Sequence, residues 1–240
     1  MAARPAASQQ ATAGSQTLSR GIRILEVLAD HDGAMTLPEL VAELGLHRSI
    51  VYRLLRTLED HRLLIRDEQG LISLGPRLAT LAAGVERDLQ QAALPALRAA
   101  ADELAATCFL VSHDQGEVTT LVSAPPHRSI IAVAQNPGTR HPLGVGAPGR
   151  AILSQIPASE WPADLDDSVR EQTAAVLAEG FAASHNEVIP GLHSVAVPLR
   201  LAGRAPLALG VVCLAMAQPA ESMARRLERA SADIAAVLGT

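Results

Sequence analysis

Three segments near the N-terminus carry apolar residues at the three- and four-residue spacing of amphipathic helices. The first is expected over 17–30. The second follows Thr36, which stands three residues before Glu39 in the spacing of a capping box. Gly45 ends the second helix, so a two-residue turn leads directly into a third helix, expected over 48–61.

The pattern changes to short strands after the third helix. The stretch LLIRDEQGLISLG holds two apolar runs, 63–66 and 71–74, on either side of a polar turn with a glycine. This arrangement is typical of a β-hairpin. Three helices with a tight turn between the second and third, followed by a small hairpin, predict a winged helix-turn-helix over residues 17–75.

The remaining chain predicts a linker and a larger second domain. Residues 76–92 are expected to form one linker helix with an apolar stripe, and 93–240 mix helical segments with strands in antiparallel order. The stripe consists of Leu78, Leu81, Val85 and Leu89. The fold class is therefore α+β, and residues 1–16, which are small, polar and without periodicity, are expected to be a disordered tail.

Composition narrows the classes of protein further. Hydrophobic residues make up 48% of the chain, which excludes disorder throughout, and the formal net charge of −5 excludes a protein that coats nucleic acid with its whole surface. Basic residues are all arginine. The chain shows no signal peptide and no apolar stretch that could span a membrane, so we expect a cytoplasmic protein with two buried, free thiols, Cys108 and Cys213.

The third helix carries the clearest candidate chemistry. Its apolar positions recur at helical spacing and predict one buried face, which leaves a polar face at the end that enters the major groove in such motifs. Arginine on that face can bond two acceptors of guanine, and an arginine in the hairpin can meet phosphate. The candidate DNA-binding residues are Arg48, Ser49, Tyr52, Arg53, Arg56 and Arg66.

A solvated helix with an outer row of arginines is the alternative interpretation of the same pattern. The local charge favours DNA binding, because residues 46–66 hold five arginines and only two acids within an acidic protein. The capped helix before the turn and the hairpin after the third helix favour it as well.

The chain resembles the IclR family of bacterial transcriptional regulators over about residues 17–238. The most specific matches are VYRLLRTLE in the third helix and ISLGPRLATLA after the hairpin, and HPLGVGAPGRAIL and LAEGFAASHNEVIPGLHSVAVPL match more loosely. Two departures are Arg62, where a glycine commonly precedes two leucines, and Pro148 in the small-residue loop.

The resemblance implies a GAF-like C-terminal domain that binds a small effector, often an organic acid, and a homodimer or homotetramer (a dimer of dimers) on operator DNA. Carried over by position, the effector site would consist of Ala147, Pro148, Ser184, Leu192, Ser194 and, as a weaker choice, Cys213. A glycine- and alanine-rich loop at a helix N-terminus favours a carboxylate there.

Other classes of function remain as alternatives. The C-terminal half could serve oligomerisation alone, or the chain could be a small-molecule enzyme, although it contains no nucleophile elbow, Walker loop or paired-carboxylate motif. The histidines lack i, i+4 spacing and cysteine partners, so we expect no metal site and no cofactor.

Overall fold

The computed structural model describes residues 15–31, 33–127 and 133–239. The chain divides into two compact units, Met1–Val85 and Glu86–Thr240. Most of the tail expected over 1–16 lies outside the described residues, and the first helix begins at Gln16 with Ser15 as its N-cap.

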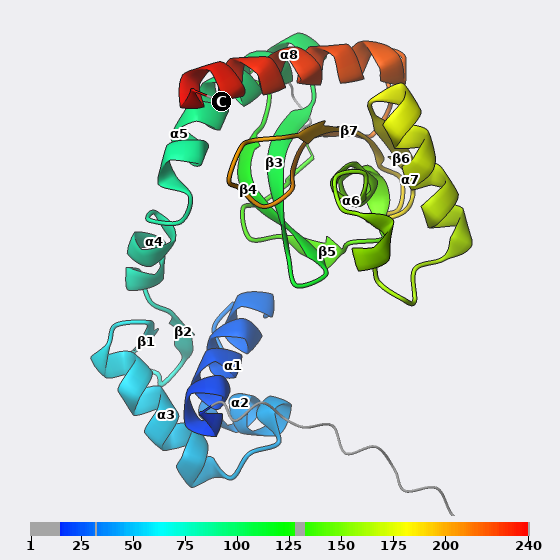
Figure 1. Ribbon diagram of the computed structural model, residues 1–240. Coiled ribbons are helices and arrows are strands. Elements are labelled where there is room, and N and C mark those ends of the chain that lie inside the picture. Colours follow the sequence, from blue (N-terminus) through cyan, green and yellow to red (C-terminus); the bar gives the residue numbers. More distant parts are fainter. Residues whose placement is uncertain (1–14, 32, 128–132, 240) are drawn as a thin grey trace, which may run out of the picture. The chain divides into compact units, whose positions relative to one another are not determined.

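The N-terminal unit is a winged helix-turn-helix, as the sequence predicts (Figure 1). The capping box forms: the Thr36 N–H donates to Glu39 Oε2 at 2.7 Å, and Gly45 ends the second helix with φ of 61°. The hairpin pairs Leu64 with Leu74. Its elements are α1 (Gln16–Asp30), α2 (Leu37–Leu44), α3 (Arg48–Asp60), β1 (Leu64–Arg66), β2 (Ile72–Leu74) and α4 (Arg77–Ala82).

The linker differs from the single helix expected over 76–92. Helix α4 ends at Ala82, and α5 (Arg87–Leu104) begins after Glu86, whose φ of 47° lies in the left-handed region. The break between α4 and α5 also divides the apolar stripe. Leu89 is fully buried in the second unit, whereas Leu81 is 55% exposed. Leu89 packs in the core of the second unit, a contact that periodicity alone does not reveal.

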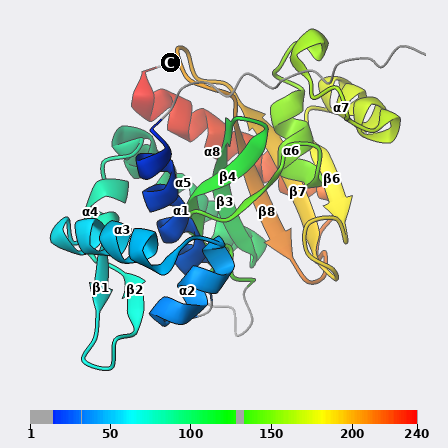
Figure 2. The ribbon, with the colours of Figure 1, turned by 90° about the horizontal axis from the view of Figure 1, so that it is seen from below.

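The C-terminal unit is built on a six-stranded antiparallel sheet in the order β5-β4-β3-β8-β7-β6, which confirms the expected α+β class (Figure 2). Figure 2 shows β8, β7 and β6 side by side. The strands are β3 (Thr107–Asp114), β4 (Glu117–Ala124), β5 (Arg140–Pro142), β6 (Ala182–His185), β7 (His193–Leu199) and β8 (Leu207–Cys213). The helices after α5 are α6 (Gly146–Leu153), the short 3-10 turn η1 (Ala158–Glu160), α7 (Asp167–Glu179) and α8 (Ala220–Leu238).

The sheet separates two apolar cores, because successive side chains of a strand point to opposite faces. In β3, Cys108 and Leu110 pack with α5 and α8, whereas Phe109 and Val111 pack with α6. Figure 1 shows α8 on one side of the sheet and α6 on the other. On the α6 side, the ring of Phe109 lies against Gly210 of β8, where an added Cβ would come within 2.4 Å of it, so this position has no room for a side chain.

Candidate functional site

Helix α3 has one apolar face and one exposed polar face. Val51, Leu54, Leu55 and Leu58 are buried in the N-terminal core. All five candidate residues of this helix are exposed on the opposite side: Arg48, Ser49, Tyr52, Arg53 and Arg56. The structure therefore brings them together on one surface, at the spacing that fits a DNA-reading helix.

Two residues that sequence reasoning missed adjoin this face. His47 is the N-cap of α3, and its Nδ1 lies 2.8 Å from Ser49 Oγ, so this ring positions the Ser49 hydroxyl. Arg20 of α1 lines a groove with Arg53 and Thr57. The capping role of His47 was detectable from its place just before the helix, whereas the proximity of Arg20 depends on how α1 packs against α3.

Arg66 in the wing, the β1–β2 hairpin, contacts a carboxylate of α3. Its Nε lies 2.9 Å from Glu59 Oε1, and both side chains are partly exposed. Arg66 is still placed on the hairpin, as expected, but a phosphate would have to compete with Glu59 for its guanidinium.

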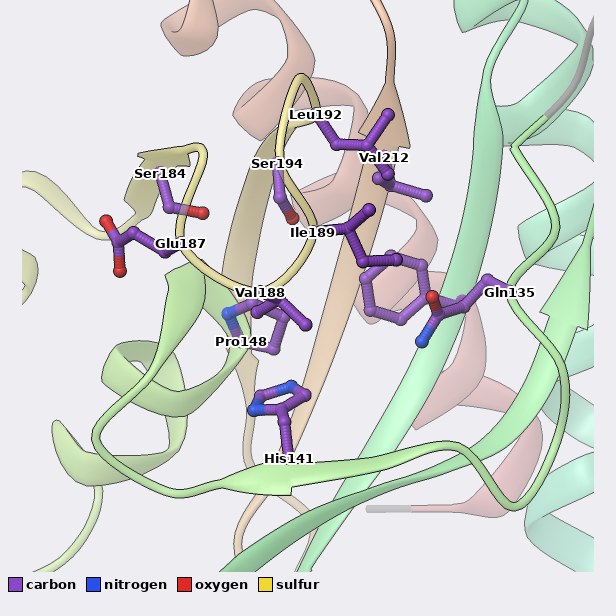
Figure 3. A pocket seen from close by; sticks show the side chains of 11 residues that line it. Gln135, His141, Pro148, Ser184, Glu187, Val188, Ile189, Leu192, Ser194 and Val212 are labelled. Atoms are coloured by element: carbon purple, nitrogen blue, oxygen red, sulfur yellow. The ribbon is translucent and has the colours of Figure 1, made fainter. Parts of the chain in front are cut away.

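A small pocket opens on the α6 side of the C-terminal sheet (Figure 3). Its volume is about 40 Å³, enough for about three water molecules. Strands β3, β5, β6, β7 and β8, Gln135 before β5, the start of α6 and the loop 186–192 enclose it. The lining residues are Phe109, Gln135, His141, Pro148, Ser184, Glu187, Val188, Ile189, Leu192, Ser194 and Val212.

Four of the six expected effector residues line this pocket: Pro148, Ser184, Leu192 and Ser194. The other two lie beside it. Ala147 is fully buried, and its backbone N–H donates to Ser184 Oγ at 3.0 Å, while Cys213 stands opposite His193 at the end of β8.

Arg150 and Glu187 form a bidentate ion pair at the pocket's edge. Arg150 Nη1 and Nη2 donate to the two carboxylate oxygens at 2.7 and 2.9 Å, and the Arg150 side chain is only 3% exposed. The Gly146 N–H also donates to Glu187, at 3.0 Å. Partial burial raises the pKa of the Glu187 carboxyl, but the hydrogen bonds and charge of Arg150 and the Gly146 N–H outweigh it, so this pKa lies below its ordinary value.

His141 of β5 lines the pocket as a neutral ring. Burial lowers the pKa of its imidazole, and the hydrogen bond to the Pro142 carbonyl only partly offsets this. Nδ1 lies 3.1 Å from that carbonyl oxygen, which can only accept, so Nδ1 carries the proton and Nε2 carries the lone pair. His141 could not be assigned to the pocket from sequence, because the pairing of β5 with β4 brings it there.

Two further properties of the described residues bear on function. Within residues 15–31, 33–127 and 133–239, no three His, Cys, Asp or Glu side chains lie together as metal ligands would. In the same ranges, no helix combines the length and apolarity needed to cross a membrane.

Known proteins are similar to both units of this chain. An IclR helix-turn-helix domain model matches residues 17–68. The chain is 28% identical over 205 residues to HTH-type transcriptional regulator Rv1719 of Mycobacterium tuberculosis, which covers 78% of each chain. The crystal structure of an IclR transcriptional regulator from Alicyclobacillus acidocaldarius superposes with a TM-score of 0.82 and 26% identity, over 93% of this chain and 99% of that one.

A second solved structure shares the fold at lower identity. It is an IclR homologue from Microbacterium hydrocarbonoxydans complexed with 4-hydroxybenzoate, with a TM-score of 0.79 and 22% identity over 93% of this chain and 99% of that one. The matched helix-turn-helix, the similarity over most of the chain and the shared two-unit architecture lead to one conclusion. This chain belongs to the IclR family of transcriptional regulators.

Proposed function

We propose that this regulator binds operator DNA through α3 and the wing, and that a small molecule in the pocket of the C-terminal unit controls this binding. The single observation that carries the proposal is the exposed polar face of α3. Its arginines stand opposite a buried apolar face, so the core holds the helix in place while its cationic side can enter a major groove.

The roles within the DNA interface follow from position. We assign Arg48 and Arg53, on the N-terminal part of α3, to base edges, because the N-terminal residues of such helices reach the bases. Arg56 lies farther along α3 and Arg66 lies on the hairpin, and we assign both to phosphate groups. Ser49 and Tyr52 add hydroxyl groups that can contact either.

The pocket supports control by a small molecule. It combines apolar walls with a few polar groups, which is the composition of ligand sites in general. The relative from Microbacterium hydrocarbonoxydans, which was solved with 4-hydroxybenzoate, shows that one protein of this fold was crystallised with a small organic molecule.

The two thiols offer no activated nucleophile for the enzyme alternative. Burial raises the pKa of Cys108 to about 12 and also raises the pKa of Cys213, so both stay protonated near neutral pH. Relatives such as Rv1719 are named transcriptional regulators. We therefore propose a cytoplasmic, non-enzymatic protein that needs no cofactor.

The proposal is tested by titrating double-stranded DNA from upstream of the protein's own gene with the full chain, with and without small metabolites. Ser194→Phe is the informative variant, because a phenyl ring fills a cavity of about 40 Å³. We expect this variant to bind the DNA with an affinity within about threefold of wild type while losing its response to metabolites. An unchanged response midpoint would place the effector elsewhere. Absence of any ligand response in wild type would favour a C-terminal unit that serves oligomerisation alone.

We also propose a homodimer, or a dimer of dimers. Leu81 and Val85 expose 55% and 52% of their surface at the end of the N-terminal unit, and Leu18 and Ile22 of α1 expose 64% and 47%. A two-fold pair of chains would double the DNA contacts and match a palindromic operator. We expect at least a dimer by analytical ultracentrifugation at micromolar concentration, and Leu81→Glu should weaken it. A wild-type monomer at that concentration would contradict the proposal.

A further inference from the structure

The N-terminal end of α6 has its anion-binding groups occupied from within the chain. The Gly146 N–H donates to Glu187, and the Ala147 N–H donates to Ser184 Oγ, both at 3.0 Å. The next residue, Pro148, has no N–H to offer. A carboxylate ligand would therefore find no open donor at the first three positions of this helix.

The arginine of this site is occupied as well. The guanidinium of Arg150 donates twice to Glu187, and its Nη2 also donates to the Ala183 carbonyl at 2.9 Å. Glu187 itself lines the pocket, whereas Arg150 is not among the lining residues. Among the described residues, the one charged group on the pocket wall is thus a carboxylate that is already paired, and it repels a second anion.

Two further polar atoms on the wall are hydrogen-bond acceptors. Nε2 of His141 carries a lone pair, as derived above. Gln135 uses its amide nitrogen to donate to Thr120 Oγ1 at 2.8 Å, which leaves its carbonyl oxygen as the end able to accept. A carboxylate can only accept hydrogen bonds, so the His141 Nε2 and the Gln135 carbonyl oxygen offer it nothing.

The hydroxyl group of Ser194 indicates that a ligand binds in this pocket. Its Oγ is buried and has no hydrogen-bond partner among the described residues. Figure 3 shows this hydroxyl among apolar side chains, close to Ile189 and Leu192. A buried hydroxyl left unpaired costs free energy, so a bound molecule that pairs with it gains affinity.

We infer that the effector binds as an uncharged molecule whose polar end, a carboxamide or hydroxyl group, donates hydrogen bonds to this wall. The inference rests on the proposed function and differs from the organic acid expected from sequence. The cavity admits about three water molecules, so the apolar body is small, and Phe109, Val188 and Val212 provide its contact surface.

The test compares three probes of the same carbon skeleton: isobutyramide, isobutyrate and isobutylamine. Binding to the full chain at pH 7.5 is followed by the emission of Trp161, the one tryptophan of the sequence. Trp161 packs against the α6-side core, and its Nε1 donates to Leu153 and Ile156 carbonyls. We expect the amide to bind at least about tenfold more tightly than either charged probe, because unpaired charge is costly in an apolar site.

Glu187→Gln provides the matched charge change. It removes the carboxylate at nearly constant shape and leaves the Arg150 charge unbalanced, so the preference should move toward isobutyrate by about tenfold or more. Glu171→Gln, on an exposed position of α7, removes the same charge away from the pocket and should leave the preference unchanged. If Glu187→Gln fails to fold, the comparison of the three probes on the wild-type protein still tests the inference.

The outcomes separate the inference from the proposed function. Tighter binding of isobutyrate than of isobutyramide to wild type would overturn the inference, as would binding of none of the three probes at 50 mM. Selective binding of the amide supports the inference. If the bound amide then leaves the affinity for operator DNA unchanged, the inference stands and control of DNA binding through this pocket is contradicted.

Discussion

Glu187→Ala is expected to lower the free energy of unfolding of the C-terminal unit by about 3–5 kcal/mol. The substitution removes one partner of a bidentate ion pair and leaves the Arg150 guanidinium, 3% exposed, with an unbalanced charge. It also leaves the Gly146 N–H without its acceptor. The cost is that of the buried charge left behind, which exceeds the net worth of the pair itself.

Urea unfolding followed by Trp161 emission measures this effect, because the tryptophan lies in the same unit as the ion pair. Glu171→Ala, on the exposed face of α7, is the control and should stay within about 0.5 kcal/mol of wild type. A loss below about 1 kcal/mol for Glu187→Ala would show that Arg150 finds another partner.

The ion pair of Arg150 and Glu187 also makes the free energy of unfolding depend on pH, in a direction that can be predicted. Because the folded state lowers the pKa of Glu187, the unfolded state binds this proton more tightly. The stabilisation is therefore complete above the ordinary carboxyl pKa of 4.5 and is lost as the pH falls through the folded value. The stability difference between wild type and Glu187→Ala should shrink between pH 7 and pH 3. A difference that grew on acidification would contradict the assigned charge states.

Arg53→Ala is expected to weaken binding to the specific operator by about 1–3 kcal/mol, roughly 5- to 150-fold, with little loss on random DNA. Arg53 is exposed on α3, and Leu54 beside it is buried, so truncation removes the contact and leaves the helix in place. The affinity ratio of operator to random DNA measures base reading directly. Equal losses on both DNAs would reassign Arg53 to phosphate.

Arg66→Ala is the matched comparison, since it should weaken both DNAs about equally and reduce the salt slope by about one. Part of that loss comes from Glu59, which loses its ion-pair partner and then faces the phosphates. Arg98→Ala, on the exposed surface of α5 in the other unit, controls for charge alone and should change neither quantity.

The DNA-binding unit was predictable because its signals are local. The Thr36–Glu39 capping box, the glycine stop at Gly45 and the apolar spacing of α3 each act within a few residues. Arg62, which stands where the family commonly has glycine, takes φ of 57°. The family's preference is thus explained by a left-handed backbone at this turn.

The break in the linker helix and the lining of the pocket depend on tertiary contacts, which the spacing of apolar residues along the chain does not determine. A 3.6-residue pattern runs through 76–92, but the helix is interrupted before Arg87, and Leu89 beyond this break is buried in the core of the second unit. The four pocket residues that were predicted came from the resemblance. Glu187 and His141 were missed, because their roles arise from the ion pair with Arg150 and from strand pairing far along the chain.

Sequence-specific DNA binding by this regulator can be measured by selection from random double-stranded DNA with the 240-residue chain. We expect enrichment of a two-fold symmetric motif whose half-sites lie about one helical turn, or a multiple of it, apart. The Arg53→Ala protein should enrich a less defined motif from the same pool. If the wild-type protein enriches no motif, it is not a sequence-specific DNA-binding protein.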